Sequence, residues 1–409
     1  MSIISLRDRM AKTILCISSY EKGQEFLRQA KREGWKVLLL TSKSLEYADW
    51  PRDHIDTVYY IPDINKEWHM PDVINGVSYL ARTEQIDRIV ALDDFDVEKA
   101  ATLREHLRIG GMGETTARYF RDKLAMRMKA RDTNIKVPDF VGILNYDRIR
   151  EFLAVVPPPY VLKPRLSAGA IGIIKIHTAE ELWREIDELG DRQSFFLLEK
   201  FIPGDIFHVD SILANKQVLF SIVSQYGLPP MEVSHEGRVF MTRTIQRGSE
   251  DESALQKLNR SVLPLLGLLQ GVSHTEYIKA HDDGKIYFLE TSARVGGAHI
   301  IELIEGATGM NLWAEWAKLE TADNVTQYSP HPSREHYAGL MVSLAKQQWP
   351  DMSSYNDAEI FWKIKKEFHA GLVVTSPKYE RIEKLLNNYT DRFYSDFFTS
   401  SPPKERPSY

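Results

Sequence analysis

The sequence predicts an α/β fold in the first third of the chain and an α+β fold in the remainder. Three observations support this. Apolar strands alternate with helices near the N-terminus, which is typical of a parallel, doubly wound sheet. A second unit, beginning near residue 136, contains strands that read as a hairpin flap followed by a helix. The stretch 274–292 reads as an antiparallel hairpin whose open end is acidic.

The first third supplies the elements of the parallel sheet in order. Strands are expected at 13–19, 36–42 and 88–94, and helices at 21–33, 72–84, 96–106 and 115–131. Polar residues stand at the strand ends, where ligands bind in such sheets; they are Ser18, Ser19, Thr41, Asp93 and Asp94. For each of them, capping of the following helix is the more common role. No G-x-G-x-x-G follows the first strand, which disfavours dinucleotide binding.

The second unit reads as a flap over a phosphate. A strand at 160–163 ends in Lys163, and a loop of small residues, 167–172, leads into a strand at 173–176. Such a loop lets backbone N–H groups approach a phosphate, and the lysine supplies a point charge. A helix at 178–190 and two apolar strands within 195–213 follow. The polar interruption between those two strands predicts a crossing between domains, which is a common place for a ligand cleft.

The acidic hairpin places two carboxylates opposite each other. With 282–284 as a three-residue loop, Ala280 faces Ile286, Ile278 faces Phe288, Glu276 faces Glu290 and His274 faces Ser292. Like charges opposite on a sheet are destabilising, and a divalent cation would compensate them. Two glutamates on a solvated sheet face are the alternative interpretation.

Arg294 and Gly296-Gly297 follow the second acidic strand at once. An arginine on the same face as Glu290 could bind an oxyanion, and the glycines permit close approach of the backbone. Carboxylates, a cation and an arginine together indicate phosphoryl chemistry with magnesium, which prefers one or two carboxylates plus phosphate oxygens.

Composition limits the class of protein. The 409 residues, with 43% hydrophobic and 27% charged content, predict two or three domains in a soluble protein. A net charge of −5 without a basic stripe argues against a nucleic-acid partner. The single cysteine, Cys16, excludes an internal disulfide. No apolar run is long enough for a membrane span, and 13–19 is too short for a secretory core, so a cytoplasmic location is expected.

Five motifs in order resemble the ATP-grasp superfamily, in the biotin-carboxylase-like branch that includes the L-amino-acid ligases. They are RDK (121–123), VLKP (161–164) with its small-residue loop, LLEKFIPG (197–204) with FHVD (207–210), HTEY (274–277) and FLETSARVGG (288–297). The resemblance covers roughly residues 10–320. It implies the ATP-grasp fold with an N-terminal Rossmann-like domain (1–114), linker helices and a small lid (115–206), and an antiparallel catalytic domain (207–399). The remaining residues, 400–409, are expected to be a disordered tail.

The resemblance also implies roles for single residues. Lys123 and Lys163 would contact the phosphates of ATP, with Ser167 and Gly169 in the loop beside them. Glu199, Lys200 and Ile202 would read the adenine at the hinge. Glu276 and Glu290 would hold Mg²⁺, with Mn²⁺ as an alternative, and Arg294 would steady the acyl-phosphate.

Two positions depart from the family pattern. Ser292 stands where the family commonly has an asparagine ligand, and we expect it to serve as the third metal ligand, through its hydroxyl or through a water. Ile206 stands where an acidic residue often contacts the ribose, which leaves His208 as the substitute.

The implied activity is that of an ATP-dependent carboxylate–amine ligase that works through an acyl-phosphate. Lys163 and Arg294 would be the catalytic residues, and the substrates would be a small carboxylate and an amine, with amino acids expected. Two alternatives stay open: a biotin-carboxylase-like subunit that acts through carboxyphosphate, and an ATP-binding regulator without turnover. A homodimer is the default expectation.

Overall fold

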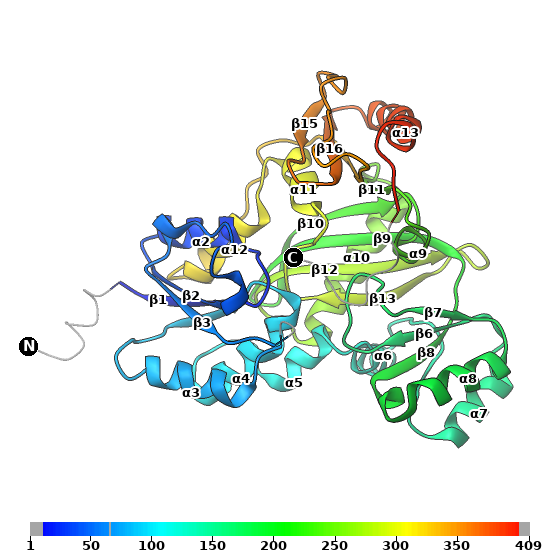
Figure 1. Cartoon of the computed structure of the whole chain (residues 1–409), viewed down its shortest axis with the longest axis horizontal. Coiled ribbons are helices and arrows are strands. Elements are labelled where there is room, and N and C mark those ends of the chain that lie inside the picture. Colours follow the sequence, from blue (N-terminus) through cyan, green and yellow to red (C-terminus); the bar gives the residue numbers. More distant parts are fainter. Residues whose placement is uncertain (1–10, 65–66, 401–409) are drawn as a thin grey trace, which may run out of the picture.

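The computed structural model describes residues 11–64 and 67–400 of the chain. These residues form three sheets: one of four strands in the order β3-β2-β1-β4, one of four strands in the order β5-β8-β6-β7, and one of eight strands in the order β13-β12-β9-β10-β11-β14-β16-β15. Figure 1 shows the N-terminal sheet at the left, the smaller β5-β8-β6-β7 sheet at the lower right and the large sheet above and between them.

The N-terminal sheet is parallel, as expected, and has helices on both faces. Its strands are β1 (Thr13–Ser18), β2 (Lys36–Ser42), β3 (Thr57–Ile61) and β4 (Arg88–Ala91), and its helices are α2 (Gln24–Arg32), α3 (Met70–Leu80) and α4 (Val97–Leu107). Every residue of β1 is buried, because helices cover the sheet on each side. The sequence analysis did not foresee β3. It is an edge strand with only one fully buried residue, so it lacks the continuous apolar run of the central strands.

The small sheet forms the lid. Two helices, α5 (Glu114–Ala117) and α6 (Lys123–Asp132), lead into it, and the lid itself contains β5 (Phe140–Gly142), α7 (Tyr146–Val155), β6 (Tyr160–Pro164), β7 (Ile174–Ile176), α8 (Ala179–Leu189) and β8 (Phe196–Lys200). Its strand pairs are all antiparallel. The helices α7 and α8 start at capping side chains, since Asn145 accepts from the Arg148 N–H (3.0 Å) and Thr178 from the Glu181 N–H (3.1 Å). Both pack their apolar residues on one face of the lid sheet.

The large sheet is antiparallel throughout. Its strands are β9 (Gly204–Ala214), β10 (Gln217–Tyr226), β11 (Phe240–Thr244), β12 (Gly271–Ala280), β13 (Ile286–Ser292), β14 (Tyr337–Leu344), β15 (Ile360–Lys363) and β16 (His369–Ser376). Its helices are α9 (Pro230–Glu236), α10 (Glu250–Leu266), α11 (Ile300–Thr308), α12 (Leu312–Thr321) and α13 (Tyr379–Asp396). The C-terminal strands β14, β15 and β16 thus complete the sheet that begins with the acidic hairpin.

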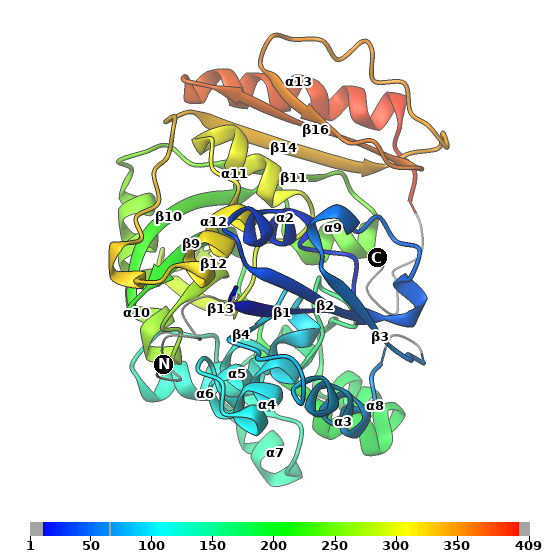
Figure 2. The same ribbon diagram turned by 90° about the vertical axis from the view of Figure 1, so that its left-hand side faces the viewer.

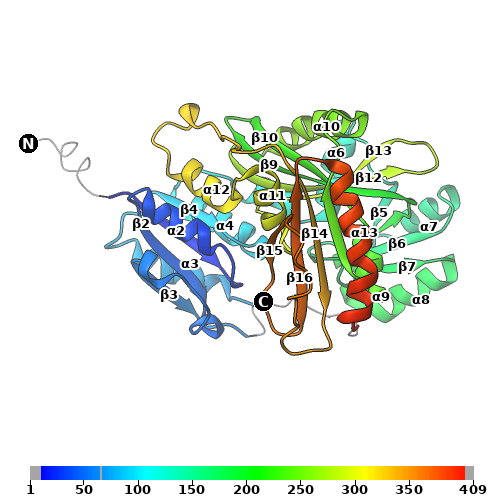
Figure 3. The ribbon, with the colours of Figure 1, turned by 90° about the horizontal axis from the view of Figure 1, so that it is seen from above.

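The two faces of the large sheet have different neighbours. Odd-numbered residues of β9, β10 and β12, such as Phe207, Val223 and Tyr277, pack against α10. The helix α13 covers β14 and β16 on the same side, and Figures 2 and 3 show it running along these strands. Even-numbered residues of β9, β10 and β12 point to the other face, which α11, α12 and the N-terminal domain cover in part and which also borders a cavity.

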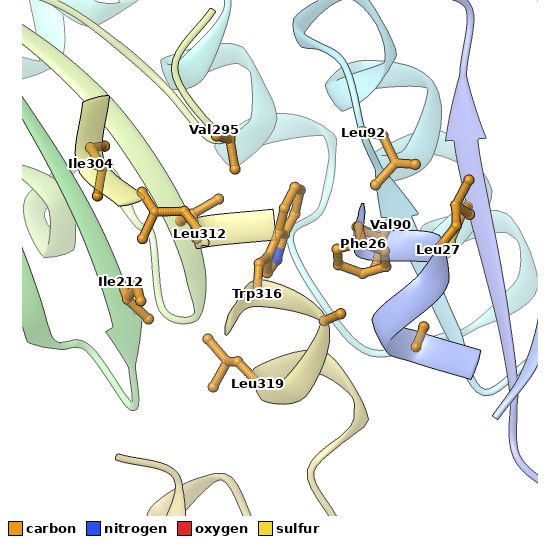
Figure 4. Packing of buried hydrophobic residues seen from close by; sticks show 14 of the residues in the cluster. Phe26, Leu27, Val90, Leu92, Ile212, Val295, Ile304, Leu312, Trp316 and Leu319 are labelled. Carbon is orange, nitrogen blue, oxygen red and sulfur yellow. The ribbon is translucent and has the colours of Figure 1, made fainter. Parts of the chain in front are cut away.

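One core joins the N-terminal sheet to the large sheet. Trp316 of α12 meets Phe26 of α2 edge-on, with ring centroids 5.1 Å apart. Figure 4 shows Trp316 between Phe26 and Val90 on one side and Leu312 and Ile212 on the other. The same buried cluster contains residues of β1, β2, β9, β12 and β14. The two sheets therefore share apolar packing rather than a wet interface.

The acidic hairpin departs from the predicted register near its turn. Ala280 pairs with Lys285, so the loop has four residues, 281–284, instead of three. Tyr277, not Ile278, faces Phe288, and both rings point into the α10 core. A bulge at Leu289 then restores the register, so the predicted pairs Glu276 with Glu290 and His274 with Ser292 are confirmed.

Two further observations bear on the predicted organisation. Within the described residues, no helix combines the length and apolarity that a bilayer crossing demands. Apart from Ser400, the tail predicted at 400–409 lies outside the described residues. The domain boundaries stay a prediction.

Candidate active site

A cavity of about 990 Å³ opens where the lid, the large sheet and the N-terminal domain meet. This volume is at the upper end of the range of about 300–1,000 Å³ for small-molecule sites. Its lining includes the two predicted acidic residues, both predicted phosphate lysines and Arg294. The cavity is therefore lined by three segments: the turn that follows β4, the lid loop and the large sheet.

The acidic pair lies on the floor of the cavity, on adjacent strands. Glu276 accepts a hydrogen bond from the Tyr226 hydroxyl (2.8 Å), and His274 Nε2 is 3.6 Å from the same carboxylate. Burial alone would raise the pKa of Glu276, but His274 and Tyr226 stabilise its charged form and hold the pKa below its usual value. Glu290 is compensated by Lys123, whose ammonium lies 2.9 Å away.

These carboxylates fit a hard divalent cation. Both offer oxygen ligands to the same cavity, and two carboxylates plus phosphate oxygens are what Mg²⁺ prefers. The Ser292 side chain also lines the cavity, and its hydroxyl donates to Asp94 (3.2 Å). Because a hydroxyl keeps its lone pairs while donating, Ser292 retains the capacity to act as a ligand.

Asp94 forms a charged junction between the N-terminal domain and the large sheet. Its carboxylate lies 3.3 Å from Arg121 and 3.5 Å from Arg294. Burial would raise the pKa of Asp94, but these two arginines outweigh it, so the pKa is lowered. Arg294 Nε is buried and finds no hydrogen-bond partner in the part of the chain that the structure describes. The predicted catalytic arginine is thus oriented from the N-terminal domain.

Lys163 belongs to a buried ion-pair triad. Glu199 Oε2 lies 2.5 Å from Lys163 Nζ, and Glu199 Oε1 lies 2.5 Å from Arg127 Nε. Burial would raise the pKa of Glu199, but the two cations hold it at about 2. Arg127 also donates to the Leu289 carbonyl at the bulge of the acidic hairpin. The triad therefore links α6, the lid and β13.

The segment 121–123 holds the base of the lid loop. Asp122 caps α6 by accepting from the Leu124 N–H (3.0 Å), and it also pairs with Arg165. Lys123 donates its side-chain proton to the Ser167 carbonyl (2.6 Å), and Arg121 donates to the Leu166 carbonyl (2.8 Å). The loop is therefore tied to the same residues that contact Asp94 and Glu290.

The other predicted nucleotide residues also line the cavity. These are Ser167, Gly169, Glu199, Lys200 and Ile202. The Lys200 N–H donates to the Asp139 carbonyl (2.8 Å), so a nucleotide would have to use another group of that residue. Their contacts with ATP stay predictions.

The predicted ribose contact at His208 is not supported. Its side chain is completely buried, its Nδ1 lies 2.7 Å from Asp210 and its Nε2 lies 2.8 Å from the Thr242 hydroxyl. Even-numbered residues of β9 face the cavity side, but the rings of His274 and Tyr226 cover His208. Their centroids lie 5.1 and 4.8 Å from the centroid of the His208 ring. His208 therefore supports the floor instead of contacting a ligand.

Asp210 connects His208 to the acidic pair through His274. Its other oxygen lies 2.9 Å from His274 Nδ1. Burial would lower the pKa of His274, but Asp210 and Glu276 raise it to about 9. A Cβ on Gly296 would lie 3.0 Å from Asp210 Oδ1 and 3.1 Å from His274 Nδ1, so the absence of a side chain there lets the backbone pass close to this pair.

Sequence reasoning missed three residues of the site. Asp94 was identified at a strand end, but capping of the following helix was taken as its more common role. The capping residue is instead Asp93, which accepts a hydrogen bond from the Phe95 N–H (3.0 Å). Arg121 was quoted only as part of a motif. Arg127 carried a readable signal, since it lies four residues after Lys123 and shares its helix face.

Comparison with known proteins gives consistent results. Residues 156–302 match the family model of the ATP-grasp domain. The L-arginine-specific L-amino acid ligase of Bacillus subtilis is 25% identical over 325 residues, which are 78% of this chain and 76% of that protein. The formate-dependent phosphoribosylglycinamide formyltransferase of Bacteroides thetaiotaomicron is 23% identical over 302 residues, which are 69% of this chain and 70% of that protein.

A solved structure agrees over nearly the whole chain. The L-amino acid ligase from Bacillus licheniformis superposes with a TM-score of 0.75 at 17% identity, covering 95% of this chain and 98% of that one. At this identity the likeness shows the fold alone. The chain contains an ATP-grasp domain and has the ATP-grasp fold, with the parallel sheet, the small antiparallel sheet and the large antiparallel sheet that the resemblance implied.

Proposed function

We propose that this ATP-grasp enzyme is a carboxylate–amine ligase that joins a small carboxylate to an amine through an acyl-phosphate. The observation that carries the proposal is the convergence of Lys123, Lys163, Glu276, Glu290 and Arg294 on one cavity. The Bacillus subtilis relative that matches 78% of this chain is named an L-arginine-specific L-amino acid ligase, which supports amino acids as the substrates.

The chemistry follows from the charges in the cavity. When bound, ATP supplies the phosphoryl group; Glu276 and Glu290 would hold Mg²⁺, which would supply charge neutralisation for the phosphate oxygens. The substrate carboxylate attacks the γ-phosphorus and ADP leaves. The amine nitrogen then attacks the acyl carbon, phosphate leaves, and the amine loses a proton. Lys123 and Lys163 would bind the phosphate oxygens, and Arg294 would stabilise the charge that develops on the acyl group.

Both lysines have carboxylate partners before a nucleotide arrives. Lys163 pairs with Glu199, and Lys123 pairs with Glu290. These pairs hold the ammonium groups in the cavity at a fixed position, so little reorganisation is needed when phosphate binds. The lid loop 167–172 would close over the phosphates and exclude water, which would otherwise hydrolyse the acyl-phosphate.

The test is release of ADP and phosphate from Mg·ATP with single and paired amino acids. We expect release to require a carboxylate and an amine together and to disappear in Glu290→Gln. A separate arm contains bicarbonate and biotin. Release only in that arm would favour the carboxylase alternative, and tight ATP binding without any release would favour the regulator.

A further inference from the structure

The cavity has a second half with a different lining. Beyond Tyr226, six apolar side chains line it: Leu228, Met231, Val233, Phe240, Val342 and Leu344. We call these residues the apolar half, and we call Lys123, Lys163, Glu199, Glu276 and Glu290 the charged half. Five of the six are half-buried and Leu228 is exposed, so all six keep accessible apolar surface where they line the cavity.

The large sheet supplies the floor of the apolar half. Phe240 on β11 pairs directly with Val342 on β14, so their side chains point to the same face. Tyr226 pairs with Thr242, two residues from Phe240, and the Tyr226 and Phe240 rings have centroids 5.8 Å apart. This face is continuous with the one that carries Glu276, because the Tyr226 hydroxyl donates to that carboxylate.

The helix α9 supplies the opposite wall. The dipeptide Pro229-Pro230 starts this short helix between β10 and β11, and it carries Met231 and Val233. Gly227, just before it, lies against Met241 of β11, because a Cβ there would come 2.3 Å from the Met241 Cε.

We infer that the apolar half binds the side chain of the substrate whose carboxylate is activated, and that this substrate is an amino acid with an apolar side chain. The inference rests on the proposed function. Tyr226 contacts both Glu276 and Phe240 of the apolar half. If the substrate carboxylate lies beside the metal ion that Glu276 and Glu290 would hold, the rest of the substrate extends past Tyr226 into the apolar half. Burying an apolar side chain there removes both surfaces from water.

Polar residues on the same elements also line the cavity: Glu232 and Ser234 on α9, Arg238 after it, Ser343 on β14 and His369 on β16. Arg238 is exposed and pairs with Glu236, and the Ser343 hydroxyl donates to the Leu344 carbonyl. A basic substrate side chain could therefore pair with one carboxylate, that of Glu232, and would lose its hydration against six apolar side chains. Burying a charged side chain against apolar surface costs free energy unless the charge is paired.

Two assays on the full chain test the inference. In the first, hydroxylamine replaces the amine, so hydroxamate formation reports which acid is activated. We expect apolar amino acids to give kcat/KM at least tenfold above arginine and aspartate. In Val342→Thr, which keeps shape and adds a hydroxyl, this preference should fall at least threefold with KM for ATP unchanged. The control Leu219→Thr alters a half-exposed residue of β10 outside the cavity lining.

The second assay separates this inference from the proposed function. Thermal unfolding is followed with Mg²⁺ and a β,γ-imido ATP analogue, with each amino acid added. Stabilisation by apolar amino acids alone would support the inference even if no acid were turned over, which would by itself refute the ligase. Stabilisation by all amino acids alike, or by none, would overturn it. So would a preference for arginine that Glu232→Gln removes.

Discussion

The charged half and the apolar half of the cavity are built in opposite ways. In the charged half, both lysines already have carboxylate partners, and these pairs join different segments of the chain: Lys163 with Glu199 and Lys123 with Glu290. In the apolar half, neighbouring strands and one short helix present side chains by register alone. The charged half therefore depends on interactions that single substitutions can break, whereas the apolar half depends on shape.

Arg127→Met should give the largest loss of stability. The substitution leaves Glu199 buried with one cation instead of two, and breaking a buried ion pair costs about 3–5 kcal/mol. Urea unfolding measures the change, and Arg184→Met on the exposed face of α8 is the control. Equal stability of the two variants would mean that Lys163 alone compensates Glu199.

Glu290→Gln should produce the largest loss of activity at near-normal stability. It removes one charge of the acidic pair and leaves Lys123 without its partner. Loss of one electrostatic contact to the transition state typically lowers kcat by about 10²–10³. ADP release measures kcat, and Glu188→Gln on α8 should keep it. A fall in stability without a fall in kcat per folded molecule would contradict the assignment.

Asp94→Asn tests whether the N-terminal domain orients the charged half. The variant keeps the shape of the side chain but weakens its hold on Arg121 and Arg294. A misplacement of about 1 Å at a reacting group can lower the rate by about 10². We expect kcat to fall while KM for ATP changes less. The exposed Asp282→Asn is the control, and an unchanged kcat would limit Asp94 to a structural role.

The buried triad also predicts a dependence of stability on pH. The folded pKa of Glu199, about 2, lies below its ordinary value of 4.5, so its ionisation contributes stability above pH 4.5 that is lost as the pH falls toward 2. The difference in unfolding free energy between the native chain and Glu199→Gln should therefore shrink over this range. Urea titrations at intervals from pH 5 downward measure it, and a constant difference would refute the assignment.

Phe240→Leu should have the smallest effect, confined to the apolar half. The substitution changes the shape of the floor of the apolar half but keeps it apolar. We therefore expect kcat/KM for the activated acid to change by about tenfold or less. KM for ATP should stay the same, because Phe240 lies on the far side of Tyr226 from the acidic pair. An equal change in both constants would mean that the two halves are not separable.

The charged half was largely readable from the sequence, and the apolar half was not. Glu276 and Glu290 could be paired because period-two alternation and a short loop fix the register, although the real loop is longer and a bulge compensates. The apolar half combines β11, β14 and α9, whose proximity follows from strand order across the eight-stranded sheet. No local pattern encodes that order. His208 was misjudged because alternation gives the face of a residue but not what covers it.

The shared core around Trp316 and the junction at Asp94 determine what happens when the chain is shortened. A fragment beginning at residue 115 would expose the Trp316 ring where Phe26 now packs, and it would leave Arg121 and Arg294 without their common carboxylate. The segment that matches the ATP-grasp domain, 156–302, therefore depends on contacts that the N-terminal domain supplies, such as the one between Asp94 and Arg294. Exchange of this segment between relatives would succeed only together with the parallel sheet that supplies Asp94.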